Sequence, residues 1–252
     1  MARGFLARLS GRHDKEMPFL EHLEELRQVI LASLAAIVIC AAGCYVFSGR
    51  LLDYIVVENV GEAQFLRPME AFSVRFKLAL ILGTVVSLPF VSFQIWSFIV
   101  PGLLGHERRT VLPLVIASTI LFLGGMAFSY FVLTPIMLQM LVGFGTEHVR
   151  PNITVDYLLD FIMKMAVGAG LLFQFPLVVV ILTLLRVMSP RQIWSRWRHA
   201  IVVILIVSAV VTPGDGPSQL VLAAPIVLLF FLSATVASLI DMARRRKEGN
   251  SA

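Results

Sequence analysis

The chain has 252 residues, of which 58% are apolar and only 15% are charged. This is too little polar surface to cover a soluble globule of that length. The formal net charge of +5 is explained by basic residues grouped between apolar segments, so it does not indicate binding to nucleic acid. No nucleophile–base pair and no glycine-rich phosphate loop stands out, which disfavours an enzyme that acts on a small molecule.

Apolar segments of the length that crosses a bilayer as a helix, roughly 20 residues, recur along the chain. We therefore predict an all-α polytopic membrane protein with six transmembrane helices, at residues 29–47, 72–98, 111–136, 157–185, 200–211 and 220–240. The fifth span has only twelve uncharged residues and would reach ~18 Å across a hydrocarbon core of ~30 Å. Either the bilayer thins beside it, or Trp194, Trp197 and Arg198 extend it at the interface. Misplaced helix ends are the simpler alternative.

Lysine and arginine are distributed unevenly between the two sides of the predicted spans. Fifteen lie in the segments on one side, whereas the loops on the other side contain only three. Basic residues concentrate on the cytoplasmic side, so both termini are predicted to be cytoplasmic. The predicted organisation is a cytoplasmic segment with an amphipathic helix (1–28), a six-span membrane domain (29–240) and a basic cytoplasmic tail (241–252).

The stretch "MPFLEHLEELRQVI" has apolar residues at helical spacing and continues into the first span. Its polar face carries three glutamates, a histidine and an arginine. An interfacial helix with a solvated charged face explains this pattern. Three glutamates are nevertheless unusual on a cytoplasmic membrane face, where basic residues normally dominate.

The stretch "GHERR" follows the second span and contains Glu107, the only acidic residue between Glu70 and Glu147. A zinc-protease motif would need a second histidine at position 110, where the chain has threonine. Glu107 could instead pair with Arg108 or Arg109, or serve as an ordinary carboxylate at the membrane rim.

Gln174 lies in the middle of the fourth span, just before Pro176. An uncompensated amide is costly in hydrocarbon, so it should face another helix, a hydrated cavity or a partner subunit. Prolines within or at the ends of spans should kink them and help to form a concave surface. Cys40 and Cys44 are four residues apart and are interpreted as small packing residues.

Five stretches together resemble the TatC family, the core receptor of the twin-arginine protein translocase. They are "FLEHLEELR", "LPFVSFQIWSFIVPGLLGHERR", "FLGGMAFSYF", "GAGLLFQFP" and "VTPGDGPSQ", in the family's order over residues 19–240. The resemblance implies that cytoplasmic glutamates bind the paired arginines of a substrate's signal peptide. Matched motif to motif, these are Glu25 and Glu107, with Phe98 contacting apolar residues beside the arginines and Arg27 orienting the acidic groups.

The same resemblance assigns the fourth span to partner docking. Gln174 matches a position where the family commonly has glutamate, and Phe173 and Pro176 flank it. The implied partners are the single-span subunits TatA and TatB. An amide does not titrate, so proton uptake at this position cannot drive transport in this chain. Lys77 also matches a family position, but it lies near the outer end of the second span and is left out of the arginine site.

We therefore predict a receptor without enzymatic activity or cofactor, which helps to move folded proteins across the inner membrane of a prokaryote. The energy would come from the proton-motive force, and the protein would be homo-oligomeric within a larger complex. The alternative is a small-solute secondary transporter. It would favour ionisable residues near the bilayer centre and an internal repeat, and neither is evident in the sequence.

Overall fold

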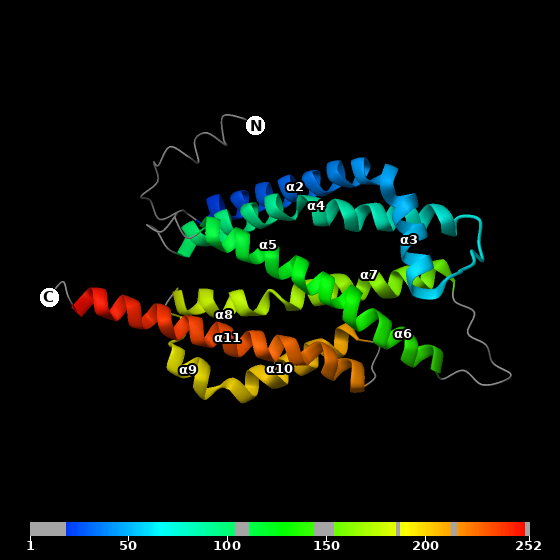
Figure 1. Ribbon diagram of the computed structural model, residues 1–252. Coiled ribbons are helices and arrows are strands. Elements are labelled where there is room, and N and C mark those ends of the chain that lie inside the picture. The colour runs from blue at the N-terminus through cyan, green and yellow to red at the C-terminus, as the bar shows by residue number, and fades with distance from the viewer. Residues whose placement is uncertain (1–18, 104–110, 144–153, 185–186, 213–215, 250–252) are drawn as a thin grey trace.

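The computed structural model of the chain describes residues 19–103, 111–143, 154–184, 187–212 and 216–249. Every named element within these ranges is helical, in agreement with the predicted all-α class. The helices lie side by side in one elongated bundle (Figure 1). We call the end where α2 (Phe19–Cys44) begins and α11 (Gly216–Gly249) ends the near end, and the opposite end the far end.

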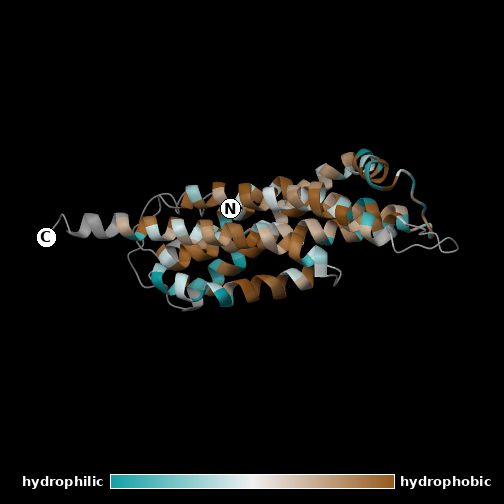
Figure 2. Cartoon of the chain, turned by 60° about the horizontal axis from the view of Figure 1, so that its bottom comes forward, coloured by the Kyte–Doolittle hydropathy of each residue, from teal (hydrophilic) through white to brown (hydrophobic). Residues whose placement is uncertain are grey.

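The first predicted span lies inside a longer helical segment. A 3₁₀ turn, η1 (Tyr45–Phe47), and α3 (Ser48–Val60) follow α2 without an intervening loop. The first span was predicted to end at residue 47, but the chain stays helical until Gly61, whose φ of +74° is readily adopted by glycine. The helix α3 turns across the far end of the bundle (Figures 1 and 2).

The helix α4 (Glu70–Leu103) returns from the far end and packs along α2. The two backbones approach closely at Gly83, where an added Cβ would lie 2.5 Å from the backbone nitrogen of Ala41. Small residues at such a crossing let two helices in a membrane come into direct van der Waals contact. Other helices cover little of α2. In the segment from His22 to Val60, only 11% of the most apolar 18-residue stretch is buried.

The third predicted span comprises α5 (Val111–Phe128), a π-helical turn η3 (Ser129–Leu133) and α6 (Thr134–Gly143). α5 starts beside α4 at the near end and crosses the bundle to reach α7 (Figure 1). At the crossing, an added Cβ on Gly125 would lie 2.7 Å from the carbonyl oxygen of Ala169. The span therefore bridges the α2–α4 pair and the remaining helices.

The fourth span consists of α7 (Val155–Leu172) and α8 (Phe175–Leu184), with a break between them. Pro176 has no backbone N–H, so it cannot donate the helical hydrogen bond to Leu172. Just before it, the backbone N–H of Gln174 donates to the carbonyl of Leu171 at 3.0 Å, three residues earlier and not four as in an α-helix. The interruption that the sequence predicted at Pro176 is present.

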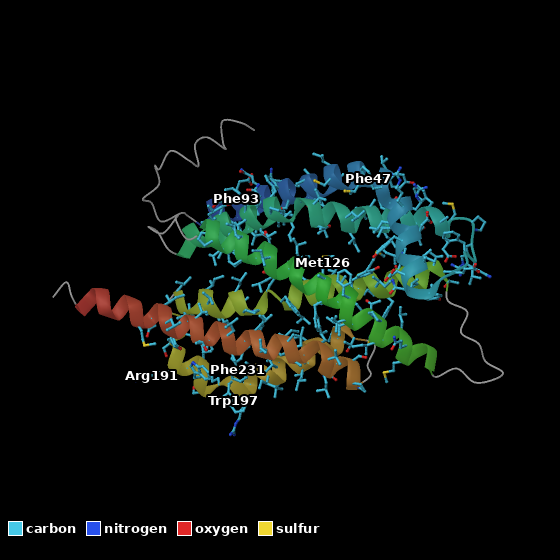
Figure 3. The ribbon with its side chains drawn as sticks, in the orientation of Figure 1. Phe47, Phe93, Met126, Arg191, Trp197 and Phe231 are labelled. Atoms are coloured by element: carbon cyan, nitrogen blue, oxygen red, sulfur yellow. The ribbon has the colours of Figure 1, made fainter. Side chains whose placement is uncertain are left out.

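The last part of the chain contains α9 (Pro190–Ser195), α10 (Trp197–Val211) and α11. Five helical segments within the described residues have the length and composition needed to cross a membrane, while α10 is shorter. Trp197, at the start of α10, packs near Phe231 of α11, with 6.2 Å between ring centroids (Figure 3). Gln219 of α11 donates its side-chain amide to the carbonyl of Leu205, which ties α11 to α10.

The largest cluster of buried apolar side chains lies among η3, α6, α7, α8, α10 and α11. Apolar residues also cover most of the outer surface of the long helices (Figure 2). An apolar surface of this extent suits a hydrocarbon surrounding and would not be stable in water. Cys40 and Cys44 are both free thiols.

Candidate functional site

The near end brings the start of α2 next to the end of α4. The ring of His22 stacks on that of Phe98, with 4.4 Å between centroids and 7° between planes. Glu25 lies one turn after His22 and is half-buried. The sequence analysis assigned Phe98 and Glu25 to one site, and they lie on helices that meet here.

Two other residues of the predicted arginine site have different surroundings. Arg27 is exposed and pairs with Glu24, its Nη1 lying 3.3 Å from a carboxylate oxygen. Glu107 lies outside the described residues, four positions after α4 ends at Leu103.

An apolar groove of about 460 Å³ begins beside this near-end site. Leu26, adjacent to Glu25, and Phe98 both line it, and it follows the contact between α2 and α4 as far as Ile37 and Val91. Among the described residues that line the groove, only Ser33 is polar. A carboxylate thus stands next to a surface that favours apolar side chains.

Gln174, at the break between α7 and α8, has a partner within the chain. Its Nε2 donates a hydrogen bond to the carbonyl oxygen of Ser118 on α5, at 2.9 Å. The Ser118 hydroxyl in turn lies 3.2 Å from that of Ser92 on α4, and both serines are buried. This polar chain joins α8, α5 and α4 in an otherwise apolar region. The sequence analysis did not decide which group Gln174 faces, and the structure shows a hydrogen bond to another helix of the same chain.

The neighbours of Gln174 lie inside the protein. Phe173 is 8% exposed and packs against Phe128, with 5.9 Å between ring centroids. Pro176 is buried as well. Gln174 itself is only part-buried and lines a groove of about 160 Å³ together with Val178 and residues of α10. The amide is thus accessible from the surface beside α10.

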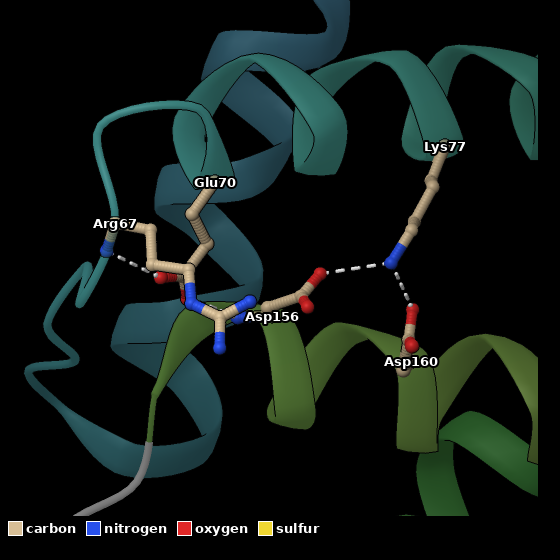
Figure 4. A network of polar contacts seen from close by, with 5 residues as sticks. All are labelled: Arg67, Glu70, Lys77, Asp156 and Asp160. Atoms are coloured by element: carbon tan, nitrogen blue, oxygen red, sulfur yellow. Dashed lines mark hydrogen bonds and ion pairs between the residues drawn. The ribbon is translucent and has the colours of Figure 1, made fainter.

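A polar cluster joins α4 and α7 at the far end (Figure 4). Lys77 of α4 places its Nζ 2.8 Å from a carboxylate oxygen of Asp156 and 2.8 Å from one of Asp160. The two aspartates are four residues apart, so they project from the same face of α7. Each side chain of the cluster is about one-third exposed, between 34% and 39%.

Glu70 anchors the loop before α4 and the start of α7 at the same end. One carboxylate oxygen accepts from the backbone N–H groups of Leu66 at 2.7 Å and Arg67 at 3.1 Å, and the other accepts from that of Asp156 at 3.1 Å. A carboxylate suits the N-terminus of a helix, where the first N–H groups have no helical partner.

Lys77 and Phe98 lie toward opposite ends of α4. The cluster itself was not predicted. The four-residue spacing of Asp156 and Asp160 at the start of a span was the signal available, because carboxylates at a membrane boundary need partners.

Long apolar helices, one of them broken beside a polar amide, and charge concentrated toward the ends define the general class of the protein. A polytopic α-helical membrane protein has this distribution because charged groups inside hydrocarbon are retained only where they are paired or hydrated.

The family model for the Sec-independent protein translocase protein TatC matches residues 21–225. The chain belongs to the TatC family. It is 36% identical to TatC of Koribacter versatilis over 251 residues, which covers 96% of this chain and 92% of that protein. It is 35% identical to the chloroplastic TATC of Arabidopsis thaliana, covering 90% and 68% respectively. The crystal structure of the twin-arginine translocase receptor TatC in DDM aligns with a TM-score of 0.74 and 30% identity, over 86% of this chain and 99% of that one.

The Lys77 pairs generate a prediction for stability. Lys77→Met leaves two carboxylates close together without their cation, so we expect the free energy of unfolding to fall by about 1–2 kcal/mol, between the values for exposed and buried pairs. Thermal unfolding in detergent measures it. The double variant Lys77→Met/Asp160→Asn should lose less than the sum of the two single effects. Strictly additive losses would show that Lys77 and Asp160 do not interact.

Proposed function

We propose that this chain is the receptor and core subunit of a twin-arginine translocase, which binds twin-arginine signal peptides and helps to transport folded proteins. Membership of the TatC family supports this function more strongly than any single contact does. The proposed binding site rests on one observation, which is that Glu25, Phe98 and the α2–α4 groove all lie at the near end. These residues offer a carboxylate and an apolar surface side by side.

The chemistry of the near end fits a peptide with two arginines followed by apolar residues. A carboxylate binds a guanidinium through two parallel hydrogen bonds, a geometry that lysine cannot reproduce. We propose that Glu25 and Glu107 hold the arginines while Phe98 contacts the adjoining apolar side chains. Arg27 is already paired with Glu24, so its role is to orient acidic groups.

We place the near end in the cytoplasm of a prokaryotic cell and the bundle in its inner membrane, with α10 as the sixth and shortest span. The uneven distribution of lysine and arginine supports this orientation. The helix α2 begins at Phe19, within the proposed cytoplasmic segment 1–28. The helix α11 extends to Gly249, within the proposed cytoplasmic segment 241–252.

The part-buried Gln174 is the proposed contact for a single-span subunit, TatA or TatB. Its side-chain nitrogen is used by Ser118, and its oxygen remains able to accept a hydrogen bond from a partner helix. Phe173 and Pro176 position the amide through the helix break and the packing beneath it. We further propose that several copies assemble in the complex.

The proton-motive force is the proposed energy source, and neither catalysis nor a cofactor is part of this function. Transport of a small solute, the alternative from the sequence, is not favoured, because the relatives are translocase subunits. One charge moving through 100 mV gains only ~2.3 kcal/mol, so the movement of a folded protein must be coupled to many charges.

The first prediction tests arginine recognition. Glu107→Ala should weaken binding of a twin-arginine peptide by ~2–5 kcal/mol if the arginine is left buried and unpaired. Glu25→Ala should act in the same direction, and the double variant should be less than additive if both hold the same arginine pair. Fluorescence titration of the purified protein measures the affinity.

Glu62→Ala is the matched control, since it also removes an exposed carboxylate but lies after α3 at the far end, away from the proposed site. It should bind the peptide normally, and the unsubstituted protein should discriminate against a twin-lysine peptide. Normal binding and export in the Glu107→Ala variant would remove Glu107 from the site.

The second prediction tests the orientation. Cysteines introduced at Gly11 and Asn250 should react with a membrane-impermeant thiol reagent only from the cytoplasmic side, and cysteines at Gly61 and Asn152 only from outside. The native Cys40 and Cys44 are first replaced by alanine. Reaction of either terminal cysteine from outside would overturn the proposed topology.

The third prediction concerns partner docking at Gln174. Gln174→Leu removes the amide with little change in bulk, so a single-span subunit should dock more weakly by ~0.6–2 kcal/mol while signal-peptide binding stays intact. Gln174→Glu, when protonated, keeps a donor and an acceptor and should support transport. Crosslinking to the subunit and an export assay measure the two effects. Full crosslinking in the leucine variant would end the docking proposal, and loss of peptide binding would show that the amide serves the fold.

A further inference from the structure

Lys164 is a charged side chain well inside the membrane-spanning part of α7. It lies nine residues after Val155, so it stands roughly 14 Å along the helix at 1.5 Å per residue. The apolar segment that contains it runs from Val155 to Leu184, which places Lys164 roughly 8 Å from its midpoint. No other charged side chain in the described spans lies closer to the middle of its helix.

The Lys164 side chain is exposed, and no ion pair or hydrogen bond joins it to any described residue. Asp160, one helical turn earlier, binds Lys77 through Oδ1 at 2.8 Å. An ammonium group in hydrocarbon is retained when it faces water, a counter-charge or a hydrogen-bond acceptor. Lys164 therefore offers an unused positive charge at a depth where a negative partner is strongly favoured.

Lys164 belongs to a stripe of exposed residues that runs the length of the broken helix. Tyr157 is 77% exposed, Leu171 61% and Val178 48%. Tyr157, Lys164 and Leu171 follow one another at seven-residue spacing on α7, so they share one face of that helix. Val178 lies seven residues further on, on α8, and lines a groove together with Leu171. Along α7 alone the stripe covers 14 residues, or roughly 21 Å, and Val178 extends it past the break.

The other faces of α7 are occupied by helices of the same chain. α5 packs on one face, where Gly125 approaches Ala169, and α10 packs on another, where Gly168 approaches Val211. The exposed stripe continues into the 160 Å³ groove formed by Leu171, Gln174 and Val178 with residues of α10. The surface is therefore an elongated, apolar contact face with one amide and one cation.

We infer that the stripe Tyr157–Lys164–Leu171–Val178 docks a single membrane-spanning helix that carries a carboxylate in the half of the bilayer nearer the far end. Charge complementarity selects this occupant, since a helix with a carboxylate at the level of Lys164 neutralises both charges within the membrane. This inference rests on the proposed docking of a single-span subunit, and it adds the contact face and the charge of the partner.

Photocrosslinking tests the contact face in membranes that contain the full chain and the single-span subunit of the same organism. A photoreactive phenylalanine analogue replaces Leu171. The matched control replaces Phe131, which is 70% exposed and lies on η3, in the same half of the bilayer as Lys164. We expect the subunit to crosslink from position 171, with a yield at least fivefold lower in Lys164→Met and within twofold of the original in Lys164→Arg. The yield at position 131 and peptide binding should not change.

The charge is tested in the partner. Each aspartate and glutamate in the corresponding half of the subunit's span is replaced by its amide. One replacement should lower the yield at position 171 as Lys164→Met does, and combining the two should add no further loss. A subunit whose span has no carboxylate in that half would overturn the inference. A yield that follows the anionic lipid content of the vesicles, and not the subunit's carboxylate, would overturn it as well.

Two further results would separate this inference from the proposed function. Lys164→Met could unfold at a lower temperature and still crosslink as the original does. Lys164 would then only offset the charge of Asp160. The inference would fail, while docking at Gln174 would stand. If the unsubstituted chain binds the signal peptide but never crosslinks from position 171, both the inference and the docking half of the proposed function fail.

Discussion

The structure depends on one constraint, which is that a polar group inside hydrocarbon needs a partner. In a helix, the backbone N–H and C=O groups are paired with one another. The described spans contain few polar side chains that need a partner of their own. The Gln174 amide uses a carbonyl of α5, and Lys77 uses two carboxylates of α7. Each of these bonds joins helices distant in sequence, so the same bonds that satisfy polar groups also fix the positions of α4, α5 and α7 in the bundle.

The sequence was informative where the physical signal is local. Hydropathy located the long spans, and Pro176 predicted the break in the fourth, because a missing N–H acts within one helix turn. The helical segment α3 was missed because Arg50 and Asp53 resemble a loop when the supporting contacts are unknown. Such contacts come from residues far away in the chain, including Val74 and Leu159, which share a buried cluster with α3.

Some contacts of the candidate site could likewise be expected from the sequence, and others could not. The adjacency of Phe98 and the start of α2 was expected from the resemblance, and the stacked rings of His22 and Phe98 give it a specific geometry. The triad of Lys77, Asp156 and Asp160 was missed, because it joins positions about eighty residues apart and no local pattern encodes that pairing. The partner of Gln174 was likewise undetermined, since any helix carbonyl can accept from an amide.

Polar atoms lead from the proposed docking site at Gln174 to α4, the helix that also carries Phe98. Gln174 donates to Ser118, whose hydroxyl contacts Ser92, and Ser92 lies six residues before Phe98 on α4. The carbonyl of Ser118 keeps a second lone pair for its helical hydrogen bond, so a partner that attracts the Gln174 amide would leave α5 intact. What would change is the link between α8 and α5, next to the cluster where Trp96 of α4 packs with Leu177 of α8. We therefore expect a shift of α8 on docking to affect the part of α4 that lies next to the proposed signal-binding surface.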